Sequence, residues 1–356
     1  MLDKTILVVL IIIVFHLNDG LCQQKDNGLN ISKMIQPLSK DGIFRDKDYF
    51  NWGSSIIKTA DNKYHLFYSR WPRKYGFYSW LTHSEIAHAI ADHPEGPYHY
   101  VETVLQGRGS DSWDAITAHN PKIKYFDGKY YLYYIGTHAD EKGLSQEELI
   151  ETAKVGYSHK NWTTLRNNQR TGTAVANSID GPWKRLDAPI VEPDGPITTL
   201  TVNPAIAKGP EGDYFLIVKG DKPNETRFIR NQAMATSKNP VGPFKIEPKP
   251  VIDNLDTEDV SMWYSESDSQ FYAIFHAHTF IGLICSGDGL NWAKASNYKI
   301  TAKKILMSNG TYMEPDRMER PFIFIENGSP KVLSLAIKKG NDTYTVFIPL
   351  SKESGL

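Results

Sequence analysis

The stretch His119–Thr137 reads HNPKIKYFDGKYYLYYIGT and contains the clearest fold signal in the chain. Its Asp-Gly pair at 127–128 is a turn sequence, and alternating apolar residues flank it on both sides. The second arm, KYYLYYIG, is so aromatic that at least one of its faces must be buried. The stretch therefore predicts an antiparallel hairpin, entered through Asn120 and Pro121.

Four other segments repeat this pattern of a polar start, a short apolar strand, a polar turn and a longer apolar strand. They read NWGSSIIKTADNKYHLFYSRW from Asn51, VNPAIAKGPEGDYFLIVKGD from Val202, EDVSMWYSESDSQFYAIFHAH from Glu258 and ERPFIFIENGSPKVLSLAIKK from Glu319. In most copies a third strand and a Gly-Pro-aromatic turn follow, as in TAVANSIDGPWKRL and NQAMATSKNPVGPFKI. Each unit thus predicts about four short antiparallel strands.

Five such units predict an all-β fold, a five-bladed β-propeller of four-stranded antiparallel blades. The last unit lacks an evident fourth strand, and we expect the segment 35–44 to supply it and to close the ring. The insertion ADEKGLSQEELIETA at 139–153 has the spacing of a short surface helix. No linker interrupts the units, so residues 23–356 are expected to form a single domain.

Residues 1–22 have the pattern of a secretory signal peptide, with Lys4 before the apolar run ILVVLIIIVF and small residues ending at Cys22. We therefore expect a secreted or periplasmic protein, with Cys285 as the one cysteine left after cleavage. The 40 basic and 41 acidic residues are balanced, which argues against nucleic acid as a partner. A membrane partner is not expected either, because the apolar run is short for a span.

The repeat, with its DGKYYLYY and SIDGPW segments, resembles the five-bladed propeller glycosidases of glycoside hydrolase families 43 and 117. The resemblance implies an oligosaccharide substrate and catalytic groups at the starts of the innermost strands. In the family 43 pattern three blades present carboxylates, which act as base, acid and a group that tunes the acid. This chain departs from that pattern, because its first three units offer Asn51, Asn120 and Asn203, and an amide cannot take a proton from water.

We expect the five strand starts to meet in one pocket. They nominate Asn51, Trp52, His119, Asn120, Asn203, Glu258, Asp259, Glu319 and Arg320. Four residues from nearby segments join them as candidates: Arg70, Trp113, His276 and His278. The asparagines could instead be plain turn residues. The two histidines could be a metal pair, but no third ligand is evident, so neither a metal nor another cofactor is expected.

Three hypotheses for function follow. The first is β-elimination on an anionic sugar, in which Asn120, Asn203 and Arg320 hold the carboxylate. His119 or His278 is then the base and Glu319 or Glu258 the acid, and an unsaturated uronic acid is the product. The second is hydrolysis by an exo-acting glycosidase, with Glu319 as acid and Asp259 or Glu258 as base. The third is a glycan-binding propeller without catalysis.

Overall fold

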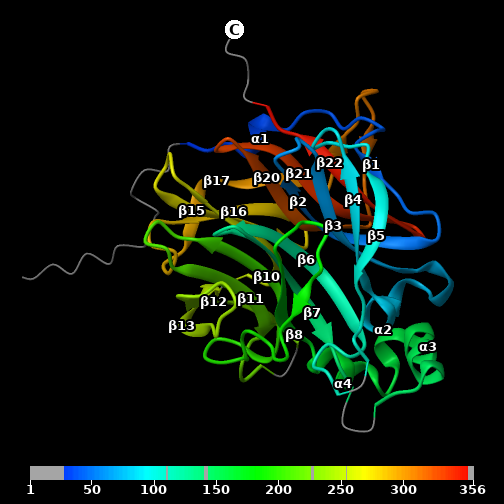
Figure 1. Cartoon of the computed structure of the whole chain (residues 1–356). Coiled ribbons are helices and arrows are strands. Elements are labelled where there is room, and N and C mark those ends of the chain that lie inside the picture. Colours follow the sequence, from blue (N-terminus) through cyan, green and yellow to red (C-terminus); the bar gives the residue numbers. More distant parts are fainter. Residues whose placement is uncertain (1–27, 110, 140–142, 226–227, 254, 352–356) are drawn as a thin grey trace, which may run out of the picture.

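The computed structural model describes residues 28–109, 111–139, 143–225, 228–253 and 255–351. Five four-stranded antiparallel sheets are arranged as the blades of a propeller (Figure 1), which confirms the predicted fold. The innermost strands β2, β6, β10, β14 and β20 contact one another in a ring around the central channel. The predicted signal peptide lies outside the described residues and stays a prediction.

Blades one to four are continuous in sequence. Blade one contains β2 (Tyr49–Lys58), β3 (Tyr64–Pro72), β4 (Glu85–Ala91) and β5 (His99–Leu105). Blade two contains β6 (Thr117–Phe126), β7 (Lys129–Thr137), β8 (Arg170–Ala176) and β9 (Lys184–Arg185). Blade three contains β10 (Thr198–Lys208), β11 (Tyr214–Asp221), β12 (Arg230–Ser237) and β13 (Lys245–Ile252). Blade four contains β14 (Thr257–Ser265), β15 (Gln270–Ala277), β16 (Phe280–Ser286) and β17 (Ala293–Ala302).

Blade five is built from both ends of the described chain. Its strands are β20 (Arg317–Glu326), β21 (Ser329–Lys339), β22 (Asp342–Pro349) and, from the N-terminal side, β1 (Ile43–Phe44). Ile43 pairs with Val346, and Phe44 pairs with Thr345. The expected closure by the segment 35–44 is therefore confirmed. Before β1 lies the short helix α1 (Ile31–Met34), and the hairpin of β18 (Ile305–Leu306) and β19 (Tyr312–Met313) precedes β20.

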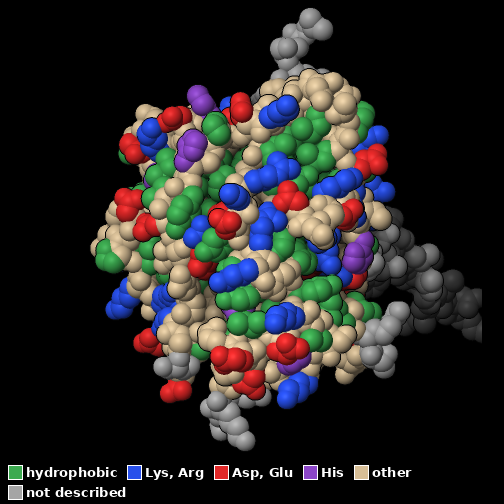
Figure 2. All heavy atoms as spheres, turned by 90° about the vertical axis from the view of Figure 1, so that its right-hand side faces the viewer, with side chains coloured by type: hydrophobic (Ala, Val, Ile, Leu, Met, Phe, Trp, Pro, Cys, Tyr) green, Lys and Arg blue, Asp and Glu red, His purple; other side chains and the backbone are tan. Residues whose placement is uncertain are grey.

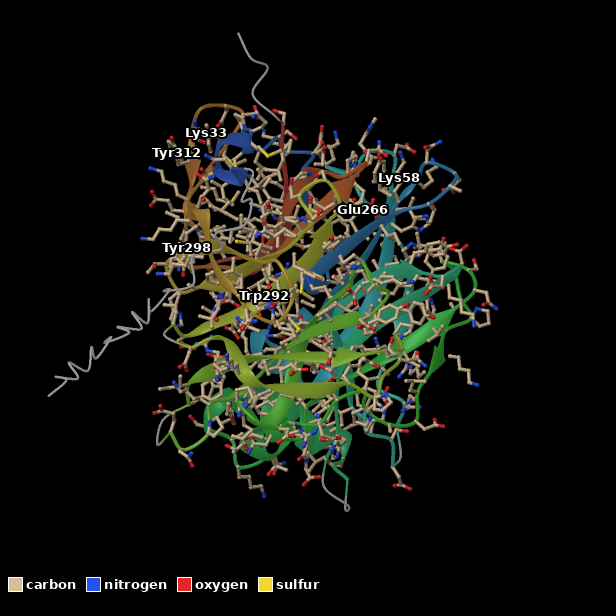
Figure 3. All side chains as sticks on the ribbon, turned by 90° about the vertical axis from the view of Figure 1, so that its left-hand side faces the viewer. Lys33, Lys58, Glu266, Trp292, Tyr298 and Tyr312 are labelled. Atoms are coloured by element: carbon tan, nitrogen blue, oxygen red, sulfur yellow. The ribbon has the colours of Figure 1, made fainter. Side chains whose placement is uncertain are left out.

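The core lies between the blades, because each sheet buries both of its faces. On β3, Leu66 and Tyr68 pack toward Phe347 of blade five, whereas Phe67 packs toward Leu132 of blade two. This alternation follows from the two-residue period of a strand. Burying an aromatic or aliphatic side chain of this kind stabilises the fold by roughly 1.5–3 kcal/mol. Figure 3 shows Trp292, Tyr298 and Tyr312 on the side of the molecule formed by blade four and the segment that follows it.

Two helical insertions stand beside blades one and two. The first, between β3 and β4, comprises η1 (Arg73–Tyr75), η2 (Phe77–Ser79) and α2 (Trp80–His83). The second, between β7 and β8, comprises α3 (Gln146–Val155), η3 (Gly156–Ser158) and α4 (Trp162–Asn167). The helix expected at 139–153 is present as α3, and Ser145 and Glu148 form a capping box at its start. Leu81, Leu149 and Leu165 bury the contact between the helices, which gather at one end of the molecule (Figure 1).

Charges on the surface are mixed. Figure 2 shows basic and acidic side chains intermixed on one face, in keeping with the formal net charge of −1. Among the described residues, none of the helices combines the length and the hydropathy that crossing a lipid bilayer requires.

Candidate active site

Each innermost strand carries the same irregularity near its start. The pairing register shifts there in all five blades, and one residue adopts a positive φ of 50° to 65°. These residues are Gly53, Asn120, Asn203, Asp259 and Arg320. Such a bulge bends the strand and re-aims its side chains. Glycine adopts the left-handed conformation freely and asparagine and aspartate tolerate it better than most residues, so Arg320 is the costliest member of the set. Residues held in such conformations cluster at functional sites.

The bulge corrects the predicted alignment of blade one. Gly53, and not Asn51, is the counterpart of Asn120, so the residue predicted to match Asn120 was placed two positions too early on this strand. Asn51 is buried, and its side-chain amide has no hydrogen-bond partner among the described residues. A side chain larger than glycine is disfavoured at Gly53, because a Cβ would lie 2.8 Å from the Asn120 side chain.

A cavity of about 680 Å³ opens over this ring of bulges. Seven of the thirteen nominated residues line it: Trp52, His119, Glu258, His276, His278, Glu319 and Arg320. Below it, Asn120, Asn203 and Asp259 line a narrow channel to which Arg320 also contributes. The structure thus brings together ten nominated side chains from all five blades.

Arg70 and Trp113 lie elsewhere, which corrects their prediction as substrate-binding residues. Arg70 is buried in an ion-pair network with Glu85 at 2.7 Å and Asp46 at 3.2 Å. Trp113 stacks on Tyr134, and it fills the space that the glycines at 136 and 172 leave open. Both side chains stabilise the fold and do not line the cavity.

Glu319 is the carboxylate whose charge is least balanced. Burial raises the pKa of Glu319 to about 7, and repulsion from Glu258 and Asp259 adds to the effect. Its nearest ion-pair partner, Arg317 Nη1, is 3.9 Å from Oε1. Glu319 therefore holds its proton near neutral pH, as a general acid must.

Glu258 is the opposite case. Burial alone would raise its pKa, but Lys219 and Arg230 hold the pKa of Glu258 well below its usual range. Lys219 Nζ lies 2.9 Å from Oε2, and Arg230 Nη1 donates to Oε1. Both oxygens are thus engaged in charge-assisted hydrogen bonds.

Asp259 is likewise fully paired. Asn203 Nδ2 donates to Oδ1 at 2.9 Å, Arg320 Nη1 lies 2.5 Å from the same oxygen, and the Arg320 backbone N–H donates to Oδ2 at 3.2 Å. Asn120 completes the network. With its amide oxygen toward Arg320, it accepts from Nη1 and Nη2 at 2.7 and 3.0 Å, and its nitrogen donates to His119 Nε2 at 3.2 Å. The opposite orientation, which donates to Asn203 at 3.0 Å, sets amide donors against the guanidinium and is disfavoured.

His119 is held as a neutral base. Burial, helped by the charge of Arg320, keeps the pKa of His119 well below its ordinary value. Its Nδ1 lies 2.7 Å from Ser84 Oγ, and its ring stacks on Trp80 with centroids 5.7 Å apart. When Nε2 accepts from Asn120, Nδ1 donates to Ser84 and the lone pair of Nε2 faces the polar network.

His276 lies on β15 and His278 in the turn that follows it, so the two do not share one strand as predicted, but both line the cavity. Burial lowers the pKa of His276. Glu258, Asp259 and His276 offer three ligand atoms within 4.8 Å of one another, enough for a metal ion. Lys219 and Arg320 already balance these carboxylates, so a divalent cation would meet two fixed positive charges there.

Several residues of the cavity were not nominated from the sequence. They are chiefly cations and aromatics from other elements: Arg166, Lys219, Lys303, Arg317, Tyr157 and Phe228. Only Lys219 carried a signal, since it interrupts the apolar run YFLIV at the end of a hairpin. Lone basic residues in loops have no pattern that separates them from ordinary surface charge.

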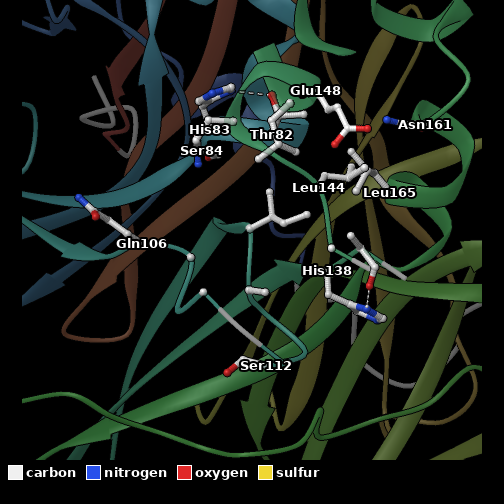
Figure 4. A pocket seen from close by; sticks show the side chains of 18 of the residues that line it. Thr82, His83, Ser84, Gln106, Ser112, His138, Leu144, Glu148, Asn161 and Leu165 are labelled. Atoms are coloured by element: carbon white, nitrogen blue, oxygen red, sulfur yellow. Dashed lines mark hydrogen bonds between the residues drawn. The ribbon is translucent and has the colours of Figure 1, made fainter. Parts of the chain in front are cut away.

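A second hollow, of about 1600 Å³, adjoins the cavity (Figure 4). Helices α2 and α4 contribute to the walls of both, and Ser84 lines the second while its partner His119 lines the first. Thr82, His83 and Glu148 are among its polar lining. Ser84 therefore connects His119, in the first cavity, to the second hollow through one hydrogen bond.

The chain is similar to several solved structures. A family 117 glycoside hydrolase produced by the marine bacterium Zobellia galactanivorans is 16% identical, with a TM-score of 0.59 over 89% of each chain. An alpha-L-arabinofuranosidase from Lactobacillus brevis is 13% identical, with a TM-score of 0.55 over 92% of this chain and 95% of that one. A thermostable family-43 glycoside hydrolase is 13% identical, with a TM-score of 0.57 over 90% and 94%. No family model and no curated protein matches the chain. The protein thus shares the five-bladed propeller fold of glycoside hydrolases of families 117 and 43.

Proposed function

We propose that the protein is a carbohydrate-active enzyme that acts on the terminal sugar of an anionic, uronate-containing oligosaccharide by β-elimination. The observation that carries this proposal is the state of the ionisable groups in the cavity. Burial keeps the pKa of His119 well below its ordinary value, so the ring is neutral at pH 7, and the pKa of Glu319 is raised to about 7, so about half of Glu319 keeps its proton there. The carboxylates nominated as hydrolytic bases, Glu258 and Asp259, have both oxygens paired with cations or amides. The cavity thus offers Glu319 as the acid and, in His119, a neutral imidazole whose Nε2 can take a proton once Asn120 releases it, whereas cations hold the nominated carboxylates in their charged, paired state.

The charge of the cavity favours an anionic substrate. Six basic residues line it: Arg166, Lys219, Arg230, Lys303, Arg317 and Arg320. Three acidic residues line it: Glu258, Asp316 and Glu319. Three further carboxylates, Asp221, Asp256 and Asp259, pair with Arg166, Arg230 and Arg320, so the six cations meet six carboxylates and protonation of Glu319 leaves one net positive charge. Fixed cations at a buried site stabilise a sugar carboxylate and, more strongly, the enolate that forms when its neighbouring carbon loses a proton.

In the proposed β-elimination, His119 and Glu319 supply both proton transfers. His119 takes the proton from the carbon beside the sugar carboxylate, and the C–H electron pair becomes the new carbon–carbon double bond. The C–O bond at the next carbon breaks, and Glu319 gives its proton to the departing oxygen. The products are an unsaturated uronic acid and either water or a shortened saccharide.

Hydrolysis is the second candidate, and the names of the structural neighbours favour it, since all three above are glycoside hydrolases or a glycosidase. Incubating the purified protein with a panel of uronate-containing oligosaccharides separates the two. Elimination generates an ultraviolet absorption from the new double bond, whereas hydrolysis generates saturated sugar with new reducing ends and no such absorption. Binding without either product would favour the third hypothesis, a glycan-binding propeller.

A further inference from the structure

We propose that the interface of blades one and two holds a transition-metal site, of the zinc type, formed by His65, His88 and Asp180. The three residues come from β3, from β4 and from the turn before β9 in the neighbouring blade. Each offers one ligand atom, and these atoms lie within 4.8 Å of one another. Two imidazoles and a carboxylate are ligands that zinc prefers, and three protein ligands leave a position open for water. This site is independent of the sugar chemistry proposed above.

The polar groups of the two rings are incompletely satisfied. His65 and His88 are 4% and 0% exposed, and His65 Nδ1 lies 2.8 Å from His88 Nε2. The outer nitrogens, His65 Nε2 and His88 Nδ1, have no partner among the described residues. Whichever ring donates the shared proton, one outer nitrogen keeps a buried lone pair without a donor and the other a buried N–H without an acceptor. Each such group costs about 1–3 kcal/mol. A cation between the rings would take the lone pairs of His65 Nδ1 and His88 Nε2, so it would replace the shared hydrogen bond and leave both outer nitrogens as N–H donors.

The rings are also in the protonation state that a metal needs. Burial lowers the pKa of His88 to about 4, and the neighbouring His65 adds to the effect. Burial likewise lowers the pKa of His65, while the charges of Asp61 and Asp180 act in the opposite direction. Both imidazoles are therefore neutral at pH 7, so a metal displaces no proton from an imidazolium.

Packing fixes the histidines and leaves the carboxylate free to adjust. His88 stacks on His65 and on Phe67, with centroids 5.0 and 4.8 Å apart and planes 12° from parallel in both pairs. Asp180 is exposed on a turn. Tetrahedral zinc with bonds of about 2.0–2.1 Å sets its ligand atoms roughly 3.3 Å apart. The 2.8 Å contact between the rings thus has to open by about half an ångström, and Asp180 can follow.

The electrostatic setting separates this cluster from the one in the cavity. The two acidic residues that act on His65 are Asp61 and Asp180, so a cation meets negative charge. In the cavity, Lys219 and Arg230 face Glu258. A divalent ion is therefore expected at the blade interface in preference to the cavity.

The test is metal titration of the full chain after treatment with a chelator. Co²⁺ added to wild-type protein should bind at one equivalent with a visible absorption band of low-symmetry coordination, and Zn²⁺ should displace it and raise the melting temperature. His88→Phe keeps the stack on Phe67 and should abolish binding. Asp180→Asn changes an exposed residue, so it should fold normally and weaken binding at least tenfold.

His276→Asn is the matched control, because it removes the histidine of the cavity cluster and should leave Co²⁺ binding unchanged. Loss of binding in His276→Asn, with retention in Asp180→Asn and His88→Phe, would assign the metal to the cavity and overturn the proposal. An absence of stoichiometric binding to the wild-type chain would overturn it as well.

Discussion

Glu319 differs from the other two carboxylates of the site in how its charge is balanced. Lys219 and Arg230 neutralise Glu258, and Arg320 neutralises Asp259, whereas Glu319 meets burial and two negative neighbours. A pair of titratable groups whose environments push their pKa values apart indicates separate chemical roles. Under the proposed mechanism, Glu319 is therefore the proton donor of the site and Glu258 a fixed counter-charge.

The rate should therefore fall as the pH rises above about 7. The active form of Glu319 is protonated, so kcat/KM should drop close to tenfold per pH unit above pH 8, following the pKa of about 7. Glu319→Gln should lower kcat by roughly 10²–10⁴-fold and abolish the fall in kcat/KM at high pH. The control is Glu326→Gln, which changes a carboxylate on the same strand that pairs with Lys58 away from the cavity and should retain wild-type kcat. Near-normal turnover in Glu319→Gln would remove it as the acid.

Asn120 gives the sharpest separation of the two mechanisms. An aspartate there would add a negative charge beside Arg320 and His119, where elimination needs to stabilise an enolate. Under elimination Asn120→Asp should abolish the ultraviolet product. Under hydrolysis the same change supplies the carboxylate of the family 43 pattern, so activity should persist or rise. An unchanged melting temperature would exclude unfolding as the cause, and release of saturated sugar by this variant would refute elimination.

At the scale of the element, the bulge repeated near the start of each innermost strand directs polar side chains toward the centre of the ring. Gly53 is the one member of the ring without a side chain, and the space that it leaves is occupied by Asn120. The cost of the left-handed conformation is spread over five strands, and surrounding pairing holds each residue in place.

Gly53→Ala tests this packing. Its φ of 50° and its 2.8 Å approach to Asn120 should lower the free energy of unfolding by roughly 1–2 kcal/mol for the backbone and about 1–3 kcal/mol more for the clash. Gly340→Ala is the matched control, because Gly340 has a φ of 57° with no atom within 4 Å of its Cβ position. Denaturant titration should show the larger loss for Gly53→Ala. Equal losses would mean that the Asn120 side chain moves away from the new methyl group without lowering the free energy of unfolding.

The hairpins, the helix α3 and the closing strand were predictable because each depends on local patterns of turn residues and alternating hydrophobicity. The bulges were not, since the register shift at Gly53 reflects packing against Asn120 and leaves no mark in the sequence beyond a glycine. Arg70 and Trp113 were misplaced for a related reason. A buried cation network and a tryptophan seated on two glycines arise from contacts between strands, which a single sequence does not display.

At the scale of the molecule, the ring is held shut by the N-terminal segment. Leu38 lies in the core of blades four and five and is 0% exposed. Its backbone N–H donates to Leu306, and its carbonyl accepts from Ser308. Phe44 in β1 contacts Tyr68 of blade one edge-on, with centroids 5.0 Å apart. Blade five therefore depends on residues that lie almost the whole chain away from it in sequence.

Leu38→Ala should consequently lower the free energy of unfolding by about 2–5 kcal/mol, the usual cost of a cavity at a fully buried leucine. Lys40→Ala, two residues away and exposed, should change it by less than about 0.5 kcal/mol. Denaturant unfolding followed by tryptophan fluorescence measures both variants. Because the segment joins the last blade to the first, the loss in Leu38→Ala should move the whole transition and not a minor early phase. A separate early phase that leaves the main midpoint unchanged would show that blades one to four hold together without the closing segment.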